Sequence, residues 1–286
     1  RRTRPNGSRR SMEPPEGSVR HALADAVARF SFSATPRFDA ELLMAHALGI
    51  DRNALMLDLD RAAPPGFAAL VERRAAAEPV AYIVGERGFW SIDLAVGPGV
   101  LVPRADSEIL IEAVREHFAV RPPATILDLG TGPGTLLLAA LDEWREASGV
   151  GIDRSAAALD YARRNAAALG MAARVDWRTG DWAAGVETRF DLILANPPYI
   201  ATDEILGREV VAYEPAEALF AGADGLDAYR AIIPDLPRLI APGGAAAIEI
   251  GHTQAAAVGA MIEAVGLRVA LHRDLGGRDR CLLATA

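Results

Sequence analysis

The sequence predicts an α/β protein in which a helical segment precedes a larger domain built on a parallel sheet. From residue 124 to the end, short apolar strands alternate with helical segments, which is typical of a parallel sheet covered by helices on both faces. Residues 17–77 contain only helical patterns. Between these regions, residues 79–104 combine alternating apolar residues with four glycines, which indicates a pair of strands joined by turns.

The helical segment is defined by apolar residues at three- and four-residue spacing. Pro36 begins one of its helices and Gly49 ends it, as expected for these residue types. A unit of about 60 residues holds little core of its own, so we expect it to pack on, or to cover, another structure. The predicted helices are 18–30, 36–49, a short one near 51–58, and 66–77.

The larger domain is expected to begin with a helix over 105–118 and to contain seven strands. Residues 274–279 join the last two strands and are too few for a crossover helix, so these strands should pair antiparallel. The predicted strands are 124–129, 149–152, 173–177, 190–195, 245–250, 267–273 and 281–285. The predicted helices between them are 134–145, 155–169, 224–241 and 253–265.

Composition excludes several classes of protein. With 51% hydrophobic and 24% charged residues among 286, the chain is expected to fold rather than to be disordered. Its apolar runs are all shorter than the roughly 20 residues that span a bilayer. One cysteine, Cys281, excludes an internal disulfide and a zinc–cysteine cluster. No segment has the pattern of a signal peptide, so we expect a cytoplasmic protein.

The charge of the chain is unevenly distributed. The formal net charge is −8, yet residues 1–11 carry five arginines and no acid. We interpret residues 1–11 as a tag remnant or a disordered leader. The rest has 25 arginines against 38 acidic residues, a net charge of −13, which gives no general attraction to phosphate backbones. A small-molecule or protein substrate is therefore expected, not nucleic acid or a membrane. The expected domains are 12–78, a linker over 79–104, and 105–286.

A glycine-rich loop follows the first strand of the larger domain. The loop consists of Gly130, Thr131, Gly132, Pro133 and Gly134. Thr135 stands where a dinucleotide fingerprint places its third glycine, and the chain has no lysine for a phosphate-binding P-loop. Asp153 ends the second strand, where a carboxylate accepts hydrogen bonds from ribose hydroxyls. Asp128 can brace the loop or meet an amino group. The pattern favours a nucleoside without phosphate.

Asp181 and Trp182 follow the third strand, and Trp182 offers a flat apolar face. With the glycine loop and Asp153, they resemble the S-adenosylmethionine site of Rossmann-like methyltransferases. The resemblance implies that Asp181 reaches the adenine amino group and that Trp182 packs on the ring. It implies S-adenosylmethionine as methyl donor and S-adenosylhomocysteine as product. No metal is expected, because the five histidines are scattered without the spacing of metal ligands.

The second candidate site is the segment of Asn196, Pro197, Pro198 and Tyr199, which directly follows the strand 190–195. The prolines remove two N–H donors, so the outward groups are acceptors: the Asn196 side-chain oxygen and the Pro197 carbonyl. Two rigid acceptors beside the aromatic ring of Tyr199 suit a planar NH2 group. They would hold its nitrogen and stabilise the positive charge that grows during methyl transfer. The proton leaves afterwards, so no strong base is required.

Nearly the whole chain after Met12 resembles the release factor glutamine methyltransferases, the HemK/PrmC family. The resemblance is carried by PVAYIVGERGFW, GPGVLVPRADSE, DLGTGPG, NPPYI, YEPAEALFAGADGLDAYR and EIGHTQ. It implies a small helical N-terminal domain for substrate recognition, a β-hairpin linker and a seven-stranded Rossmann-like methyltransferase domain.

The resemblance also implies a reaction and its partners. The chain would methylate the side-chain amide N5 of Gln in the Gly-Gly-Gln motif of class-1 release factors, modulating translation termination, as a monomer. Residues 130–134, Asp153, Asp181, Trp182 and Asn196 would contact the donor. Residues 196–199 would hold the Gln, with Asn196, Pro197 and Tyr199 as the catalytic residues. Two alternatives remain. One is a ribosomal protein L3 glutamine methyltransferase. The other is an N6-adenine nucleic-acid methyltransferase, which shares NPPY but which the net charge of −13 disfavours.

Overall fold

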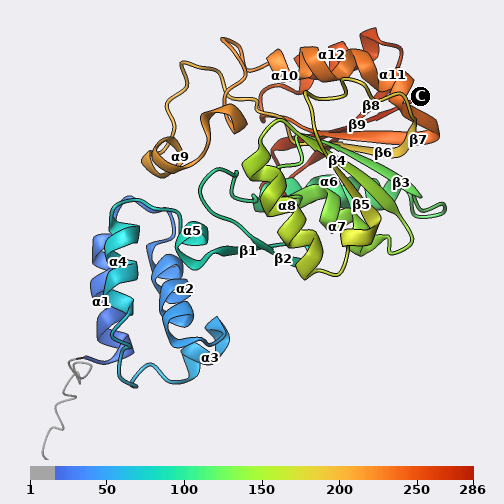
Figure 1. Ribbon diagram of the computed structural model, residues 1–286. Coiled ribbons are helices and arrows are strands. Elements are labelled where there is room, and N and C mark those ends of the chain that lie inside the picture. Colours follow the sequence, from blue (N-terminus) through green and yellow to red (C-terminus); the bar gives the residue numbers. More distant parts are fainter. Residues whose placement is uncertain (1–16) are drawn as a thin grey trace, which may run out of the picture. The chain divides into compact units, whose positions relative to one another are not determined.

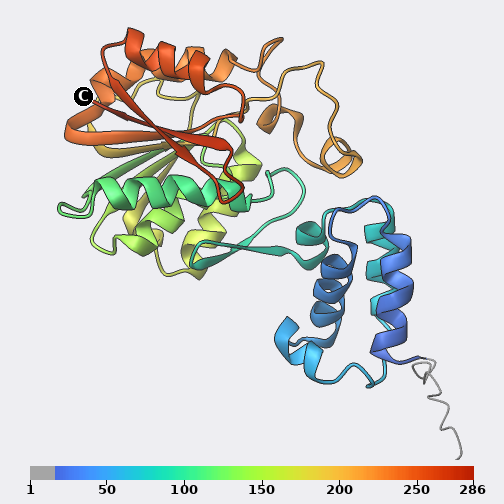
Figure 2. The same ribbon diagram turned by 180° about the vertical axis from the view of Figure 1, so that it is seen from behind.

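The computed structural model describes residues 17–286, so the interpreted leader 1–11 lies outside the described residues. The chain divides into two compact units, one extending to Val84 and the other spanning Gly85–Ala286. Figures 1 and 2 show the first unit as a group of helices and the second as a sheet covered by helices.

The described residues of the first unit form helices and the loops between them, and the predicted helices are confirmed to within about two residues at each end. It also contains α5, which corrects the expectation that residues 79–84 belong to the strand pair. This stretch is apolar without alternation, and Ile83 packs into the helical core. Because its apolar face is buried there, the segment forms a turn of helix. The helices are α1 (Val19–Arg29), α2 (Pro36–Leu48), α3 (Arg52–Leu57), α4 (Phe67–Ala75) and α5 (Val80–Val84).

A buried ion pair joins two helices of this unit. Arg74 Nε and Nη2 both donate to Asp39 Oδ2, at 2.9 and 2.7 Å, and the two side chains are 4% and 9% exposed. Arg29 and Glu72 form an equally short pair, at 2.6 and 2.7 Å, but on the surface. The two pairs have similar distances and differ in burial, so we expect them to differ in how much they stabilise the fold.

Asp39→Ala is expected to lower the free energy of unfolding by about 3–5 kcal/mol, because it leaves the Arg74 guanidinium buried without its carboxylate. Glu72→Ala is expected to cost far less, since Glu72 and its partner Arg29 are both exposed to water. Urea unfolding followed by circular dichroism measures both. Equal losses in the two variants would refute the distinction drawn from burial.

The second unit begins with the hairpin of β1 (Glu86–Phe89) and β2 (Ile92–Ala95), which confirms the strand pair over a shorter range than 79–104. Its main sheet has seven strands in the order β5-β4-β3-β6-β7-β9-β8. Strands β3 to β7 are parallel, and β9 is antiparallel to both β7 and β8, as expected for the last two strands. The strands are β3 (Thr125–Leu129), β4 (Ser148–Asp153), β5 (Val175–Thr179), β6 (Phe190–Ala195), β7 (Ile240–Glu249), β8 (Arg268–Arg273) and β9 (Asp279–Thr285).

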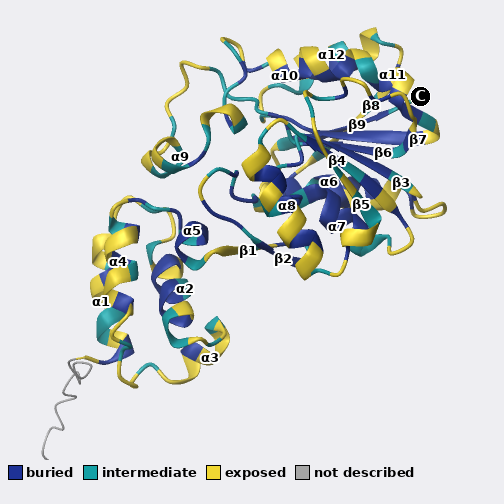
Figure 3. Cartoon of the chain, in the orientation of Figure 1, coloured by how far each residue is buried: buried dark blue, intermediate teal, exposed yellow. Residues whose placement is uncertain are grey.

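Helices cover both faces of this sheet, and Figure 3 shows its central strands buried between them. The single helix predicted over 224–241 is wrong. Pro234 and Pro237 each lack an N–H, and the chain forms three short helical pieces there. Helix α9 (Arg208–Tyr213) was not predicted. On one face lie α6 (Glu108–His117), α7 (Thr135–Glu143) and α8 (Ala156–Ala168); on the other lie α10 (Asp227–Ile232), α11 (Leu236–Leu239) and α12 (Ala255–Ala264). The 3₁₀ turns are η1 (Ala105–Ser107), η2 (Ala172–Arg174), η3 (Ala216–Ala218) and η4 (Ile233–Asp235).

The strand order places the candidate residues together. The chain passes from β3 to β4 on one side, and later returns to β6 on the other side of β3. Open α/β sheets bind ligands at such a switch point, outside the carboxyl ends of the strands. The loops that follow β3, β4 and β6 therefore meet at one edge of the sheet.

Within residues 17–286, no helix has both the length and the apolar character that crossing a membrane requires.

Candidate active site

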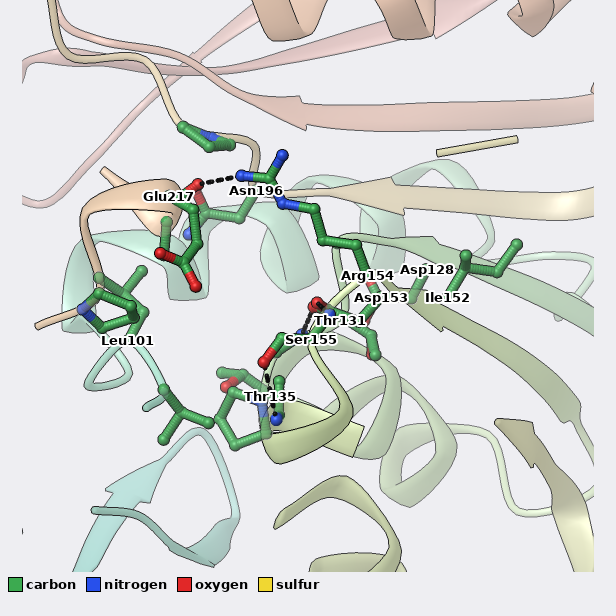
Figure 4. A pocket seen from close by; sticks show the side chains of 18 of the residues that line it. Leu101, Asp128, Thr131, Thr135, Ile152, Asp153, Arg154, Ser155, Asn196 and Glu217 are labelled. Atoms are coloured by element: carbon green, nitrogen blue, oxygen red, sulfur yellow. Dashed lines mark hydrogen bonds between the residues drawn. The ribbon is translucent and has the colours of Figure 1, made fainter. Parts of the chain in front are cut away.

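A cavity opens at the carboxyl edge of the sheet, between the loops that follow β3, β4, β5 and β6 (Figure 4). Most of the residues expected at the site line it. Gly134, Pro197 and Tyr199 lie outside its lining. The expected residues that do line it are Gly130, Thr131, Gly132, Pro133, Asp153, Asp181, Trp182, Asn196 and Pro198.

The glycine loop uses its own N–H groups within the protein. The N–H groups of Gly130 and Thr131 both donate to the Ile152 carbonyl, at 2.9 and 3.0 Å. The Gly132 N–H donates to Asp153 Oδ2 at 2.8 Å, and the Gly134 N–H donates to the Thr131 carbonyl at 2.9 Å. Pro133 has no N–H. A phosphate cradle needs free N–H donors, so this loop is unsuited to phosphate and suits a ligand that packs against backbone.

Two glycines show why the loop lacks side chains. Gly130 has φ +72°, and a Cβ there would lie 3.1 Å from the ring of Trp182. Gly132 has φ +57°, and a Cβ there would meet nothing within 4 Å. Both backbone conformations favour glycine. The Trp182 ring thus closes one side of the loop, while the backbone at Gly132 is open to the cavity.

Asp153 is held in a fixed orientation at the end of β4. Its Oδ2 accepts the Gly132 N–H and its Oδ1 accepts the Ser155 N–H, both at 2.8 Å. Each carboxylate oxygen has a second lone pair, and the side chain lines the cavity. Asp153 can therefore accept two ligand hydroxyls while it also anchors the glycine loop.

Asp128 is 1% exposed at the end of β3 and acts as a brace beneath the loop. Its Oδ2 accepts the Thr131 hydroxyl at 2.6 Å and the Leu137 N–H at 3.3 Å. Burial raises the pKa of Asp128 to about 7, although these two bonds favour the ionised form. The bonds tie β3, the loop and α7 together.

The pKa of Asp128 predicts how stability depends on pH. In the unfolded chain an aspartate has a pKa of about 4, so between pH 4 and 7 the folded state binds more protons. The contribution of Asp128 is thus fully present below about pH 4 and is lost as the pH rises through 7. Asparagine does not titrate, so Asp128→Asn does not lose stability in this way. The free energy of unfolding of the variant minus that of wild type should therefore be larger at pH 8 than at pH 4.5. Urea unfolding at both pH values measures the difference, with the exposed Asp160→Asn as control; an equal difference at both would contradict the assignment.

Asn196 lies at the end of β6 with its amide orientation fixed. Its Nδ2 donates to the Ser107 hydroxyl oxygen at 3.1 Å, which leaves Oδ1 as the group available to accept hydrogen bonds. Pro198 lines the cavity beside it. The Tyr199 hydroxyl lies 3.4 Å from Glu249 Oε1 and 3.5 Å from Arg280 Nη1.

Sequence reasoning missed a wall of the cavity formed by residues 99–104 and 215–218. Arg104 Nη2 and Glu214 Oε1 pair at 2.6 Å, and the Val102 N–H donates to Glu214 Oε2 at 3.2 Å. Figure 4 shows Arg154 extending to Glu217, whose carbonyl it meets at 3.3 Å. Both wall segments lie in motifs that carry the family resemblance, GPGVLVPRADSE and YEPAEALF, but their residue types alone indicated no chemistry.

Among the described residues, no group of histidine, cysteine, aspartate and glutamate side chains is arranged to hold a metal ion.

Comparisons with known proteins agree on one family. Residues 21–85 match the family described as PrmC N-terminal domain, and residues 104–222 match Methyltransferase small domain. The release factor glutamine methyltransferase of Cereibacter sphaeroides is 49% identical over 253 residues, covering 86% of this chain and 90% of that protein. The one of Rhodospirillum rubrum is 46% identical over 259 residues, covering 87% and 78%. A solved methyltransferase from Pyrococcus furiosus has a TM-score of 0.50 at 17% identity, covers 68% of this chain and 89% of its own, and supports the fold alone.

Proposed function

This chain belongs to the release factor glutamine methyltransferases, and from that premise we propose how its site performs the reaction. A methyl group passes from S-adenosylmethionine to the side-chain amide nitrogen of the Gln in the Gly-Gly-Gln motif of class-1 release factors. The observation that carries the proposal is the fixed amide of Asn196. Its Nδ2 is bound to Ser107, so its Oδ1 is an acceptor at the cavity that Asp153 and the glycine loop also line.

The donor half of the cavity fits a nucleoside without phosphate. Asp153 offers acceptors to the ribose hydroxyls, Trp182 offers a face to the adenine, and Asp181 offers an acceptor to the adenine amino group. The N–H groups of the glycine loop are already bonded, which disfavours nucleotides carrying a pyrophosphate. S-adenosylmethionine has no phosphate, and when bound it supplies a methyl carbon activated by a sulfonium.

The acceptor half must overcome the poor nucleophilicity of an amide nitrogen, whose lone pair is delocalised into its carbonyl. Asn196 Oδ1 and the Pro197 carbonyl accept the two N–H groups of the substrate Gln. These bonds hold the nitrogen in one orientation and strengthen as positive charge grows on it, which lowers the barrier to transfer. The proton leaves after the methyl group arrives, so the site needs no strong base.

The same proposal assigns the rest of the chain. The helical unit, described over residues 17–84, recognises the release factor as a protein surface, and the hairpin segment 85–104 leads into the catalytic domain. Outside residues 1–11 the charge is −13, which favours a protein over a nucleic acid as partner. The enzyme acts as a monomer in the cytoplasm, where release factors serve ribosomes.

The test is methyl transfer from labelled S-adenosylmethionine to a purified class-1 release factor, beside the same factor with its Gly-Gly-Gln glutamine changed to alanine. Label on the unchanged factor alone is the expected result. Label on neither factor, with donor binding demonstrated by calorimetry, would refute the release factor as substrate. Ribosomal protein L3 and adenine-containing nucleic acid are then the acceptors to assay.

A further inference from the structure

A buried asparagine connects the β1–β2 hairpin to the glycine loop. Asn165 lies inside the alanine-rich helix α8 and is 2% exposed. Asparagine is a poorer helix former than alanine, and burying an amide group costs free energy unless the amide is hydrogen-bonded. An asparagine at this position therefore indicates hydrogen-bond partners outside the helix.

Both polar atoms of the Asn165 side chain are hydrogen-bonded to the backbone of two other segments. Its Oδ1 accepts the Ala95 N–H at 2.8 Å. Its Nδ2 donates to the Ala95 carbonyl at 3.1 Å and to the Pro133 carbonyl at 2.9 Å. An amide NH2 has two hydrogens, so both are used. The side chain thus pairs with the end of β2 as a backbone amide would, and it holds Pro133 at the same time.

The two segments that Asn165 joins both form walls of the cavity. Pro133 lines the cavity from the glycine loop, and the wall formed by residues 99–104 begins four residues after Ala95. Pro133 stands between Gly132 and Gly134, which have φ +57° and +88°. Because glycine restricts the backbone little, the local sequence leaves the position of Pro133 weakly fixed. The bond from Asn165 to its carbonyl supplies a fixed point for the loop.

We propose that Asn165 is a positioning residue of the methyl-donor site, which holds the glycine loop at a fixed separation from the chain that forms the 99–104 wall. Asn165 does not itself line the cavity, so it acts through Pro133 and Ala95. The inference rests on the proposed function, because it takes this cavity as the site of S-adenosylmethionine. Without these bonds, the loop and the wall must be ordered when the methyl donor binds, and that ordering lowers its affinity.

Asn165→Asp tests the bonds to the two carbonyls with almost no change in the size of the side chain. A carboxylate has no hydrogen to donate, so the carbonyls of Ala95 and Pro133 each face another acceptor, and only the bond from the Ala95 N–H remains. The calorimetric affinity for S-adenosylmethionine is expected to fall about 10–100-fold. At saturating methyl donor, kcat should stay within about twofold of wild type, because the acceptor end at Asn196 is unchanged.

Asn165→Ala is a milder variant that retains the helix. Alanine favours the helix, and the space left by the amide admits a water molecule that can bond to the freed backbone groups. The affinity for S-adenosylmethionine should therefore lie between the affinities of wild type and Asn165→Asp. This order follows hydrogen bonding and opposes side-chain size, because aspartate resembles asparagine in size more closely than alanine does.

Arg174→Met is the matched control for the loss of bonds to backbone carbonyls. Arg174 Nη1 lies 3.1, 3.3 and 3.1 Å from the carbonyl oxygens of Leu141, Trp144 and Ala147, and none of these residues lines the cavity. The variant should lower the temperature of thermal unfolding and leave the affinity for S-adenosylmethionine unchanged. Loss of stability reduces the amount of folded enzyme, and with it the apparent kcat, but not the affinity of the folded molecules.

The outcomes separate this inference from the function it rests on. Wild-type affinity in Asn165→Asp, beside a lower unfolding temperature, would overturn the positioning role, and so would an equal loss of affinity in Arg174→Met. A wild-type enzyme that binds S-adenosylmethionine but labels no release factor would overturn the proposed substrate and leave the calorimetric comparison intact. A wild-type enzyme that does not bind S-adenosylmethionine would overturn both the proposed function and this inference.

Discussion

Asn196→Ala is expected to reduce methyl transfer by about 10²–10³-fold while the affinity for S-adenosylmethionine stays nearly constant. Asn196 lies at the acceptor end of the cavity, and its Oδ1 is the oriented partner for the substrate amide. Removing it leaves the nitrogen with one acceptor, so the positive charge that develops on it is stabilised less. The donor contacts at Asp153 and Trp182 do not involve this side chain.

Transfer is measured under single-turnover conditions with labelled donor, and donor affinity by calorimetry on the same sample. Asn53→Ala, an exposed asparagine of α3, is the control for loss of a side-chain amide and should behave as wild type. Turnover near the wild-type rate in Asn196→Ala would refute the acceptor role. Loss of donor binding together with turnover would instead assign Asn196 to the donor.

Asp153→Ala is expected to weaken binding of S-adenosylmethionine by about 10²–10⁴-fold. The variant loses the acceptors for the ribose hydroxyls and releases the Gly132 and Ser155 N–H groups that shape the loop. Hydrogen bonds to charged groups contribute about 1.5–3 kcal/mol each, so losing the two bonds to the ribose hydroxyls amounts to about 3–6 kcal/mol, or that fold-change in affinity. kcat at saturating donor should change much less.

Calorimetric titration of the donor into wild type and Asp153→Ala gives the comparison. Asp160→Ala is matched for the change in charge, since Asp160 is exposed on α8 in an ion pair with Arg163. It should leave donor affinity unchanged. Similar affinities in the Asp153 variant and wild type would show that Asp153 does not bind the donor, and the acceptor for the ribose hydroxyls would then be another residue.

Much of the catalytic domain was predictable because the information is local in the chain. A buried parallel strand appears as a short apolar run, and all seven predicted strands exist with ends that differ by a few residues. Only glycine readily takes the positive φ found at Gly130 and Gly132, so the loop was visible in the sequence. Asp153 and Asn196 come directly after strands, where the ends of parallel neighbours meet.

Where the predicted secondary structure was wrong, a local or a tertiary effect outweighed the pattern on which the prediction rested. Helix periodicity predicted one helix over 224–241, but two prolines divided it. Residues 79–84 were assigned to strands because they precede a true hairpin. Burial of Ile83 in the helical unit made them helical instead. The sequence also did not indicate the partners of the Tyr199 hydroxyl, which bonds to Glu249 and Arg280; the role of the ring as an aromatic wall at the substrate stays a prediction.

By itself, the sequence determined the fold class, the order of the elements, the glycine loop and the positions of Asp153 and Asn196. Only the tertiary structure decided which way Asn196 faces. Ser107 lies 89 residues before Asn196, and Glu249 lies 50 residues after Tyr199. Neither has a residue type or spacing that indicates chemistry along the chain. These contacts arise because η1 and the ends of β6 and β7 meet in the folded chain, where the Ser107 oxygen accepts the Asn196 amide N–H and Glu249 accepts the Tyr199 hydroxyl.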